Sequence, residues 1–364
     1  MLLLILCACT FFDMKTAVLL SGGVDSSVAL SLLADQGHDL HAFYLKVWLE
    51  DEVAYLGDCP WEEDLQFVRA VCEQFDVSLT IVPLQTQYLE RVVSHALREL
   101  RSGRTPSPDI FCNQRIKFGA FFDCIDDSFA KVASGHHAQI AASNGDCVLK
   151  RGADPVKDQT YFLSNLSQSQ LARTLFPIGH LRKSQVREIA DRIELPNRAR
   201  KDSQGICFLG KIRYRDFIQF HLGTQPGDII DQTSDRRLGE HEGFWFYTIG
   251  QRFGLGLGGG PWYVADKDAE RNIVYVAHGD HLEQSKRSAF TVRDLNWISG
   301  APEDGALQVR VRHAPKLASC RVRSSAIDTL EVELAEPDAG IASGQHAVFY
   351  DGDTCLGGGV IERG

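Results

Sequence analysis

Apolar runs and amphipathic helical patterns alternate along the chain to about residue 200, and this alternation limits the possible folds more than any other feature. In the helical segments the apolar residues recur every three or four positions, as Leu65, Val68 and Val71 do. Strands that alternate with helices pair in parallel, because each helix returns the chain across the sheet. We therefore expect an α/β domain built on a parallel sheet. The expected strands are 15–20, 38–48, 79–84 and 130–137, and the expected helices are 26–36, 59–77, 87–103, 116–129, 167–176 and 184–195.

The sequence changes character near residue 220, where Gly and Pro become frequent and helical periodicity ends. We expect short strands and glycine turns over 239–264 and a strand over 272–279. Short strands at the spacing that is typical of β-sandwiches and barrels follow at 306–313, 318–324, 329–337 and 346–362. We expect an N-terminal domain over 14–215, a small central β-rich module over 216–283 and a C-terminal β-barrel over 284–364. We interpret residues 1–13 as an N-terminal extension, with Met14 as the expected start, because a strand pattern follows Met14 directly and no Lys or Arg precedes the apolar run.

Cysteine usage and charge restrict the environment and the partners of the chain. The 10 cysteines include no Cys-x-x-Cys pair, which argues against a zinc ribbon or finger. We expect a reducing, cytoplasmic environment and no membrane partner, since no apolar run is long enough to span a bilayer. The net charge of −10 is unfavourable for binding nucleic acid, but a local basic surface is sufficient for that purpose.

The segment SGGVDSS, residues 21–27, joins the first expected strand to the first expected helix. Glycines let an anion approach the backbone, and the amides at a helix N-terminus donate hydrogen bonds to phosphate. Asp25 repels phosphate, so its place in such a loop makes sense if Mg²⁺ bridges the two. The loop lacks the Gly-Lys-Ser/Thr ending of a Walker A motif and the Gly-x-Gly-x-x-Gly of dinucleotide-binding folds. Taken alone, it is also compatible with a plain connecting turn.

SGGVDSS resembles, residue for residue, the PP-loop of the ATP-pyrophosphatase superfamily, whose members cleave ATP between its α and β phosphates. Together with six further stretches, it closely resembles the tRNA-specific 2-thiouridylase family from about residue 15 to the C-terminus. These stretches are GRTPSPDIFCNQRIKFGAF (103–121), GHH (135–137), KDQTYFL (157–163), KDSQGICFLG (201–210), TIGQRFGLGLGG (248–259) and CLGGG (355–359). The resemblance implies a PP-loop domain (adenine nucleotide alpha hydrolase-like), a central adaptor module and a tRNA-binding barrel.

The resemblance also implies a reaction, with ATP and Mg²⁺ as cofactors. ATP adenylates O2 of the wobble uridine of a tRNA, and sulfur from a cysteine persulfide then replaces that oxygen at C2, which gives 2-thiouridine. Asp25 is the expected Mg²⁺ ligand. Leu45 stands where the family usually has Met, and it is expected to pack on adenine. The residues expected to bind ATP are Ser21, Gly22, Gly23, Val24, Asp25, Ser26, Ser27, Val28, Leu45 and Gly135.

By the same resemblance, Cys207 carries the persulfide and Cys112 is the partner thiol or nucleophile, and the two form a transient disulfide. Asp109 is the expected acid/base and contacts the target base. Cys112 and Cys207 both lie in polar segments that contain Gly or Pro, which we predict to be loops. For the remaining cysteines outside the extension we expect inert, buried side chains. These are Cys59, Cys72, Cys124, Cys147, Cys320 and Cys355.

Contacts with tRNA are implied at three places. Ser107, Pro108 and Asp109 face the target base, and Ser107 puts a hydroxyl where the family usually has the amide of Asn. The second group is the tripeptide Lys157, Asp158 and Gln159, and the third is the pair Arg312 and His313.

The residues themselves support the third contact. Arg310 and Arg312 alternate with two valines, so a strand would place both arginines on one face and the valines in the barrel core. Such a face suits phosphate, although a solvated strand face is the alternative.

Two other classes of function remain open. A PP-loop amide-forming ligase would need neither Cys112 nor Cys207. A non-catalytic ATP-binding regulator would hold ATP without releasing pyrophosphate. For the sulfur-transfer interpretation, the expected partners are tRNA and a sulfur-donor protein, either a sulfur-relay protein or a cysteine desulfurase, and we expect a monomer.

Overall fold

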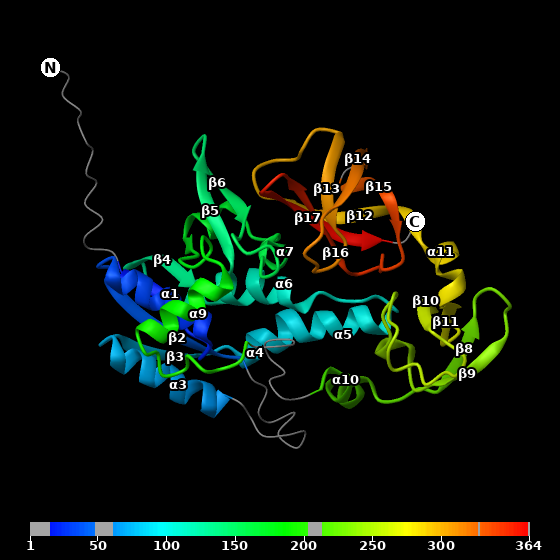
Figure 1. Ribbon diagram of the computed structural model, residues 1–364, viewed down its shortest axis with the longest axis horizontal. Helices are drawn as coiled ribbons and strands as arrows, with labels where there is room; N and C mark the ends of the chain where they lie inside the picture. Colours follow the sequence, from blue (N-terminus) through cyan, green and yellow to red (C-terminus); the bar gives the residue numbers. More distant parts are fainter. Residues whose placement is uncertain (1–14, 48–60, 203–212, 327, 363–364) are drawn as a thin grey trace.

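The computed structural model describes residues 15–47, 61–202, 213–326 and 328–362. Three sheets follow one another along the chain: a parallel sheet, a small mixed sheet and a barrel (Figure 1). This confirms the expected fold class, an N-terminal α/β domain followed by a β-rich module and a C-terminal β-barrel. The extension 1–13, Cys59 and Cys207 lie outside the described residues.

The N-terminal sheet has five parallel strands, and its strand order determines where a ligand can bind. The order is β3 (Ser78–Pro83), β2 (Leu40–Lys46), β1 (Lys15–Leu19), β4 (Phe129–Ser134) and β7 (Thr174–Leu175). From β1 the chain first adds strands on one side and then returns to add β4 and β7 on the other. Open α/β sheets bind ligands beyond the carboxyl ends of the strands at such a reversal. The segments that follow β1 and β4 are therefore the expected place for a site.

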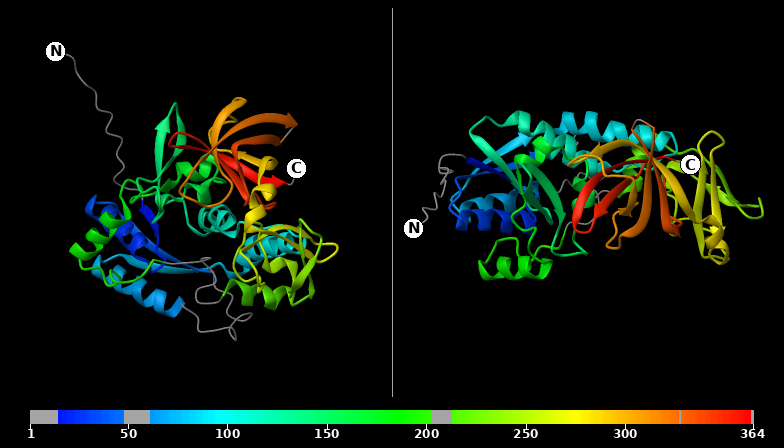
Figure 2. Two further views of the ribbon diagram at one scale, coloured as in Figure 1. Left: turned by 45° about the vertical axis from the view of Figure 1, so that its right-hand side comes forward. Right: turned by 90° about the horizontal axis from the view of Figure 1, so that it is seen from above.

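Helices bury both faces of this sheet (Figure 2). On one face Val28, Val68 and Val186 share a core with the strands. They belong to α1 (Val24–Asp35), α3 (Trp61–Gln74) and α9 (Lys183–Arg192). The other face is covered by α4 (Gln85–Tyr88), the π-helical turn η2 (Leu89–Val93), α5 (Ser94–Arg101), α6 (Pro108–Cys112) and the π-helix η3 (Asn113–Ala120).

Two expected helices are shorter than their sequence patterns predict. The helix expected over 116–129 ends with η3 and the 3₁₀ turn η4 (Phe122–Cys124), and β4 begins at Phe129. The helix expected over 167–176 is α8 (Gln168–Ala172), followed directly by β7. In both segments an apolar residue near the end, Phe129 or Leu175, belongs to a strand, because pairing with the sheet outweighs the helical spacing of the sequence.

The central module follows α10 (Tyr214–Leu222) and contains four strands. Their order is β10 (Trp262–Asp268), β11 (Ile273–His278), β8 (Gly227–Asp231) and β9 (Arg237–His241). Of the short strands and glycine turns expected over 239–264, the glycine turns are confirmed, but strands reach only the two ends of that range. It holds the 3₁₀ turn η5 (Phe244–Phe246) and glycine-rich irregular chain until β10 begins.

The C-terminal barrel is closed by pairing between its first and last strands. Its six antiparallel strands are β12 (Arg287–Trp297), β13 (Gly305–Arg310), β14 (Ala318–Ala326), β15 (Thr329–Asp338), β16 (His346–Asp351) and β17 (Thr354–Glu362). Val292, Val332 and Phe349 lie in its core.

A hairpin that the sequence analysis did not anticipate joins the N-terminal domain to the barrel. It consists of β5 (Ala138–Ser143) and β6 (Asp146–Arg151). β6 pairs with β17, with Leu149 opposite Cys355, so the barrel sheet continues into the N-terminal domain. Leu149 and Cys355 also belong to the hydrophobic core that contains α5 and α6.

Among the described residues no helix is both long and apolar enough to cross a lipid bilayer.

Candidate functional site

The turn between β1 and α1 leaves the start of the helix open. Gly23 is the N-cap of α1, and no side chain caps the helix. Two serine hydroxyls bond within the turn instead: Ser26 Oγ and Ser27 Oγ donate to the Gly23 carbonyl at 3.0 and 3.1 Å. The amides of the first turn therefore have no side-chain acceptor. A glycine-lined helix start of this kind is suited to phosphate.

Gly22 is enclosed on the other side of the same turn. Its φ is 77°, and a Cβ there would lie 2.8 Å from the Asp64 carbonyl oxygen and 2.9 Å from Nη1 of Arg200. The Gly22 carbonyl accepts hydrogen bonds from Arg200 Nη1 at 3.1 Å and from Asn197 Nδ2 at 2.8 Å. Asn197 Nδ2 also donates to Ser27 Oγ at 2.9 Å. Hydrogen bonds from Asn197 and Arg200, in the segment that follows α9, thus hold this turn in place.

The chain after β4 touches this turn at the point where the strand order reverses. A Cβ on Gly135 would lie 2.5 Å from the Ser26 nitrogen and 2.7 Å from the Asp25 carbonyl carbon. Gly135 therefore packs directly against the first turn of α1. Leu45, near the carboxyl end of β2, is half-buried against the core that contains α5 and α6. The expected ATP-binding residues from β1, α1, β2 and β4 thus gather at one edge of the sheet.

Asp25 carries the negative charge of this edge, and two basic side chains face it. Lys183 Nζ lies 2.6 Å and 2.7 Å from the two carboxylate oxygens, and His137 Nε2 lies 3.5 Å from Oδ1. Burial alone would raise the pKa of Asp25, but His137 and the charge of Lys183 outweigh burial and hold that pKa below its usual value. Asp25 is therefore ionised at neutral pH. Sequence reasoning missed Lys183, because a lysine in the first turn of an amphipathic helix resembles any surface lysine.

Lys183 is shared between Asp25 and a second carboxylate. Its Nζ lies 2.9 Å from Asp202 Oδ1, and Asp202 also binds Lys157 Nζ at 2.7 Å and the guanidinium of Arg187. Burial opposes ionisation of Asp202, but these three hydrogen-bonded cations hold its pKa well below the usual range. Lys157, an expected tRNA contact, is thus tied to the charged cluster beside Asp25. Cys207, five residues further along the chain than Asp202, lies outside the described residues.

A pocket of about 150 Å³ brings together residues from α6, α7 (Thr160–Leu163) and the barrel. The rings of Phe162 and His313 lie 4.5 Å apart in its wall. Tyr161 OH donates to the His346 carbonyl at 3.1 Å, and burial raises the pKa of Tyr161 above its usual value, so the phenol stays protonated. The pocket is small and would hold a single planar ring rather than a whole nucleotide. It is lined by Pro106, Ser107, Pro108, Asp109, Tyr161, Phe162, His313 and Gln345.

Cys112 lies at the end of α6, one helical turn after Asp109. The expectation that this cysteine sits in a loop is wrong. Pro108 occupies the first turn of the helix, where its fixed φ favours helix formation, and the apolar residues Ile110 and Phe111 anchor the helix in the core. The Cys112 side chain is only 2% exposed. Asp109 and Cys112 are three residues apart on one helix, so they project from the same side of it.

The other described cysteines differ in exposure. Cys72, Cys320 and Cys355 are buried as expected, and burial raises the pKa of their thiols to about 11, about 12 and about 12. The expectation of burial is wrong for Cys124, which is exposed after the early end of the expected helix, and Cys147 on β6 is partly exposed. The described residues contain no cluster of three or more His, Cys, Asp or Glu side chains that could hold a metal ion.

The two arginines expected on one face of a strand point in different directions. β13 ends at Arg310, so the alternation of a strand does not extend to Arg312. Arg310 turns inward and its Nη1 lies 2.7 Å from Asp158 Oδ2. Arg312 is 47% exposed and makes two hydrogen bonds, of 2.7 and 2.9 Å, to the carboxylate of Asp338. RNA cannot reach the buried Asp158 carboxylate in this arrangement, so we revise its expected role as a tRNA contact.

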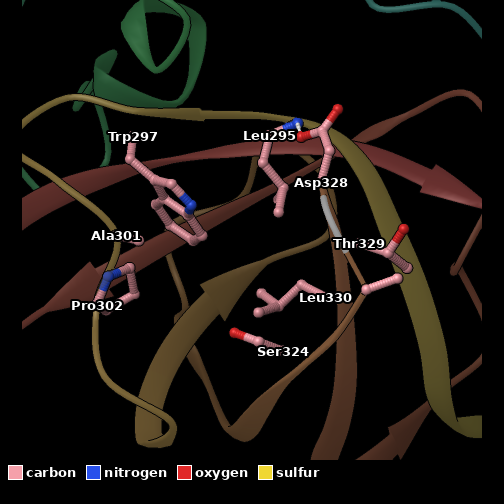
Figure 3. A pocket seen from close by; sticks show the side chains of 9 residues that line it. Leu295, Trp297, Ala301, Pro302, Ser324, Asp328, Thr329 and Leu330 are labelled. Atoms are coloured by element: carbon pink, nitrogen blue, oxygen red, sulfur yellow. Dashed lines mark hydrogen bonds between the residues drawn. The ribbon is translucent and has the colours of Figure 1, made fainter.

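A larger cavity, of about 260 Å³, lies in the barrel between residues of β12, β14 and β15 and the segment before β13 (Figure 3). Leu295, Trp297, Pro302 and Leu330 form its apolar part. The Asp328 carboxylate at its rim accepts a hydrogen bond from the Leu295 amide at 2.8 Å. None of the candidate residues from the sequence analysis lines this cavity. We therefore assign the candidate functional site to the smaller pocket and to the turn between β1 and α1.

Comparison with known proteins accounts for all three parts of the chain. Residues 14–211, more than half of the chain, match a family model described as the tRNA methyl transferase HUP domain. Residues 215–278 match the tRNA methyl transferase PRC-barrel domain, and residues 287–361 match the aminomethyltransferase beta-barrel domain.

Curated relatives match along almost the whole chain. The tRNA-specific 2-thiouridylase MnmA of Parabacteroides distasonis is 43% identical over 355 residues, which are 96% of this chain and 99% of that protein. The protein of the same name from Porphyromonas gingivalis is 41% identical over 362 residues, covering 96% of this chain and 100% of that protein. A solved structure of NMN synthetase from Francisella tularensis aligns with a TM-score of 0.35 and 17% identity, over 58% of this chain and 78% of that one. On the evidence of the family model and these near full-length relatives, the chain belongs to the tRNA-specific 2-thiouridylase family.

Proposed function

We propose that the protein is an ATP-dependent tRNA-uridine 2-sulfurtransferase that converts the wobble uridine of tRNA to 2-thiouridine. The observation that carries the proposal is α6, which places Asp109 in the wall of a ring-sized pocket and Cys112 one turn further along the same helix. Relatives that bear the name tRNA-specific 2-thiouridylase support it. Although the matching family model is described in terms of methyl transfer, a buried thiol one helical turn from the pocket residue Asp109 and an open helix start for phosphate suit sulfur transfer driven by ATP.

ATP would lie at the reversal between β1 and β4. The amides at the start of α1 would receive its phosphates, Gly135 leaves room for the turn, and Leu45 would pack on the adenine. The Lys183 ammonium group, which donates to Asp25, would also donate a hydrogen bond to a phosphate group. One ionised carboxylate together with phosphate oxygens meets the needs of Mg²⁺, so Asp25 fits as its protein ligand. The ion would neutralise negative charge on the phosphates.

The proposed reaction has two stages. First, O2 of the uridine attacks the α-phosphorus of ATP and pyrophosphate leaves, which makes C2 electrophilic. Second, the Cys112 thiolate attacks the inner sulfur of a persulfide on Cys207, so a disulfide forms and the outer sulfur departs as hydrosulfide. Hydrosulfide attacks C2, AMP leaves with the former O2, and Asp109 takes the proton. An external thiol reductant then reopens the Cys112–Cys207 disulfide, and a sulfur-donor protein restores the persulfide.

The tRNA would reach the pocket across the barrel and the segment before α7. Arg312 is half-exposed beside the pocket residue His313, and Lys157 is partly exposed beside the Asp25 cluster. Gln159 is tied to His137, because its Oε1 accepts from the His137 amide at 2.8 Å. Binding of RNA by these residues, a sulfur-relay or cysteine desulfurase partner, a monomeric state and a cytoplasmic location all remain predictions.

The direct test is nucleoside mass spectrometry of tRNA that lacks 2-thiouridine, incubated with the purified protein, ATP, Mg²⁺, a thiol reductant and a persulfide donor such as a cysteine desulfurase with cysteine. We expect 2-thiouridine to appear only when ATP is present, with pyrophosphate and AMP as products. Retention of ATP without release of pyrophosphate would instead indicate a non-catalytic ATP-binding protein. Incorporation of an amine would indicate an amide-forming ligase.

Replacing Lys183 with Met should reduce tRNA-dependent pyrophosphate release by about 10- to 100-fold, because the charge beside Asp25 and the phosphates is lost. Binding of tRNA should remain normal, since Lys183 lies at the sheet edge and not on the barrel. Lys15→Met, at the opposite end of β1, is the matched control and should keep full activity. Normal pyrophosphate release by Lys183→Met, or loss of tRNA affinity alone, would contradict this assignment.

Replacing Arg312 with Ala should weaken tRNA binding several-fold and make it less sensitive to salt. Loss of one phosphate contact should lower the slope of log affinity against log salt by about 0.7 to 0.9. The measurement is a filter-binding titration at several KCl concentrations. Arg293→Ala, which breaks a comparable exposed pair with Glu362 on the barrel, is the control. An unchanged slope for Arg312→Ala would exclude a phosphate contact at this residue.

A further inference from the structure

The barrel is fastened to the N-terminal domain by a buried cluster that the proposed reaction does not use. We call it the buried junction: Arg151, Asp158, Thr160, Arg310 and Tyr350. At its centre Arg310 Nη1 lies 2.7 Å from Asp158 Oδ2, and the two side chains are 1% and 0% exposed. Asp158 comes from the segment before α7, whereas Arg310 ends β13 of the barrel. The pair therefore joins two domains almost entirely out of contact with solvent.

Every oxygen of the Asp158 carboxylate is occupied. Oδ1 accepts from the Gly152 amide at 3.1 Å and from Thr160 Oγ1 at 3.0 Å, and Oδ2 is shared by Arg310 and Arg151 Nε, the latter at 3.3 Å. Arg310 makes longer contacts: Nη1 also contacts Tyr350 OH at 3.4 Å and Nη2 donates to the Pro315 carbonyl at 3.5 Å, while its buried Nε has no hydrogen-bond partner among the described residues. The pair with Asp158 is therefore the main contact that fixes the guanidinium, and breaking it would leave a desolvated charge unpaired.

The junction lies next to the residues that line the pocket. Tyr161 and Phe162 follow Asp158 by three and four positions, and His313 follows Arg310 by three. His313 Nε2 donates to the backbone carbonyl of Asp158 at 3.2 Å, and its ring packs on Phe162. A displacement of Arg310 relative to Asp158 would therefore move His313 relative to Phe162, and with it the barrel side of the pocket.

We infer that Arg310 and Asp158 are positioning residues for the proposed reaction. Their buried ion pair sets the position of the barrel wall of the pocket, at His313, relative to the α7 wall, at Phe162. Neither side chain touches RNA or the reacting atoms. The inference rests on the proposed function, and it replaces the expected tRNA contact of Asp158 with a role in alignment. Alignment of reacting groups controls the chemical step strongly, since a displacement of about 1 Å costs roughly 100-fold in rate.

The test compares Arg310→Met with the wild-type protein in steady-state thiolation of tRNA, and equilibrium tRNA binding is measured separately. We expect kcat to fall by about 10- to 100-fold, while the Kd for tRNA changes by less than about three-fold, because the exposed contacts remain. Arg310→Lys keeps the charge and can reach Asp158, but it cannot also hold the Pro315 carbonyl and Tyr350. It should therefore recover part of the lost kcat.

Two controls separate alignment from a general loss of stability. Val332→Ala removes buried volume from the barrel core away from the junction, and Arg293→Met breaks an exposed ion pair on the barrel. Each should keep kcat near the wild-type value at temperatures where the protein is folded. A folded Arg310→Met protein with a normal kcat would overturn the inference. So would a Val332→Ala protein whose Tm and kcat fall as much as those of Arg310→Met. An Arg310→Met protein that binds tRNA more weakly but keeps its kcat would overturn it as well. A wild-type protein that forms no 2-thiouridine would overturn the proposed function itself.

Discussion

Gly135→Ala is expected to abolish ATP-dependent turnover, with a loss of at least about 100-fold in pyrophosphate release. The added methyl group would lie 2.5 Å from the Ser26 nitrogen and 2.7 Å from the Asp25 carbonyl carbon, and both are backbone atoms that cannot rotate away. The first turn of α1 must therefore move, and the amides proposed to bind phosphate move with it. Binding of a non-hydrolysable ATP analogue by calorimetry measures the effect directly.

Gly305→Ala supplies the control for this substitution. Gly305 begins β13, and a Cβ there meets no atom within 4 Å. We expect its turnover to be normal and the tRNA affinity of both variants to be unchanged. Near-normal ATP binding by Gly135→Ala would show that the nucleotide does not depend on the turn after β1.

Cys112→Ser should eliminate 2-thiouridine while tRNA-dependent pyrophosphate release persists. Serine is close in size to the buried cysteine, so the helix should stay folded, but a hydroxyl cannot attack a persulfide to release its outer sulfur. Nucleoside mass spectrometry and a pyrophosphate assay on the same samples separate the two stages. Cys207→Ser should give the same pattern.

The same substitution at Cys72 tests the general cost of removing a buried thiol. Cys72 lies on α3, and its burial raises the thiol pKa to about 11, so it stays protonated and unreactive. Cys72→Ser should keep its thiolation activity. Full turnover by both Cys112→Ser and Cys207→Ser would remove the basis for sulfur transfer and favour an amide-forming ligase.

The sequence predicted the parallel sheet and the glycine turn after its first strand well, because both depend on local patterns. The apolar runs that became β1, β2, β3 and β4 are short and bounded by polar residues, and SGGVDSS lies directly after the first. The β5–β6 hairpin was missed although Asn144 and Gly145, with φ of 52° and 91°, form a turn that Asn-Gly favours strongly. Its strands are short, and β6 completes its pairing only with β17, more than 200 residues away.

Two errors and one omission at the site have a common origin. Pro106, Ser107 and Pro108 suggested a loop, but α6 begins within this segment because Ile110 and Phe111 bury themselves against the sheet. Arg310 looked like a surface arginine, and its partner Asp158 lies 152 residues earlier in the chain. Lys183 could not be distinguished from other lysines for the same reason. In each case the deciding partner is remote in sequence, so local patterns carry no sign of it.

The sheet that runs from β5 through β6 into β17 means that the C-terminal barrel is not a detachable RNA-binding appendage. A protein truncated after the central module would expose the backbone donors and acceptors of β6 as a bare edge and would lose Tyr350 and Cys355 from the interior it shares with α5 and α6. Such a fragment should aggregate rather than survive as a minimal nucleotide-binding unit.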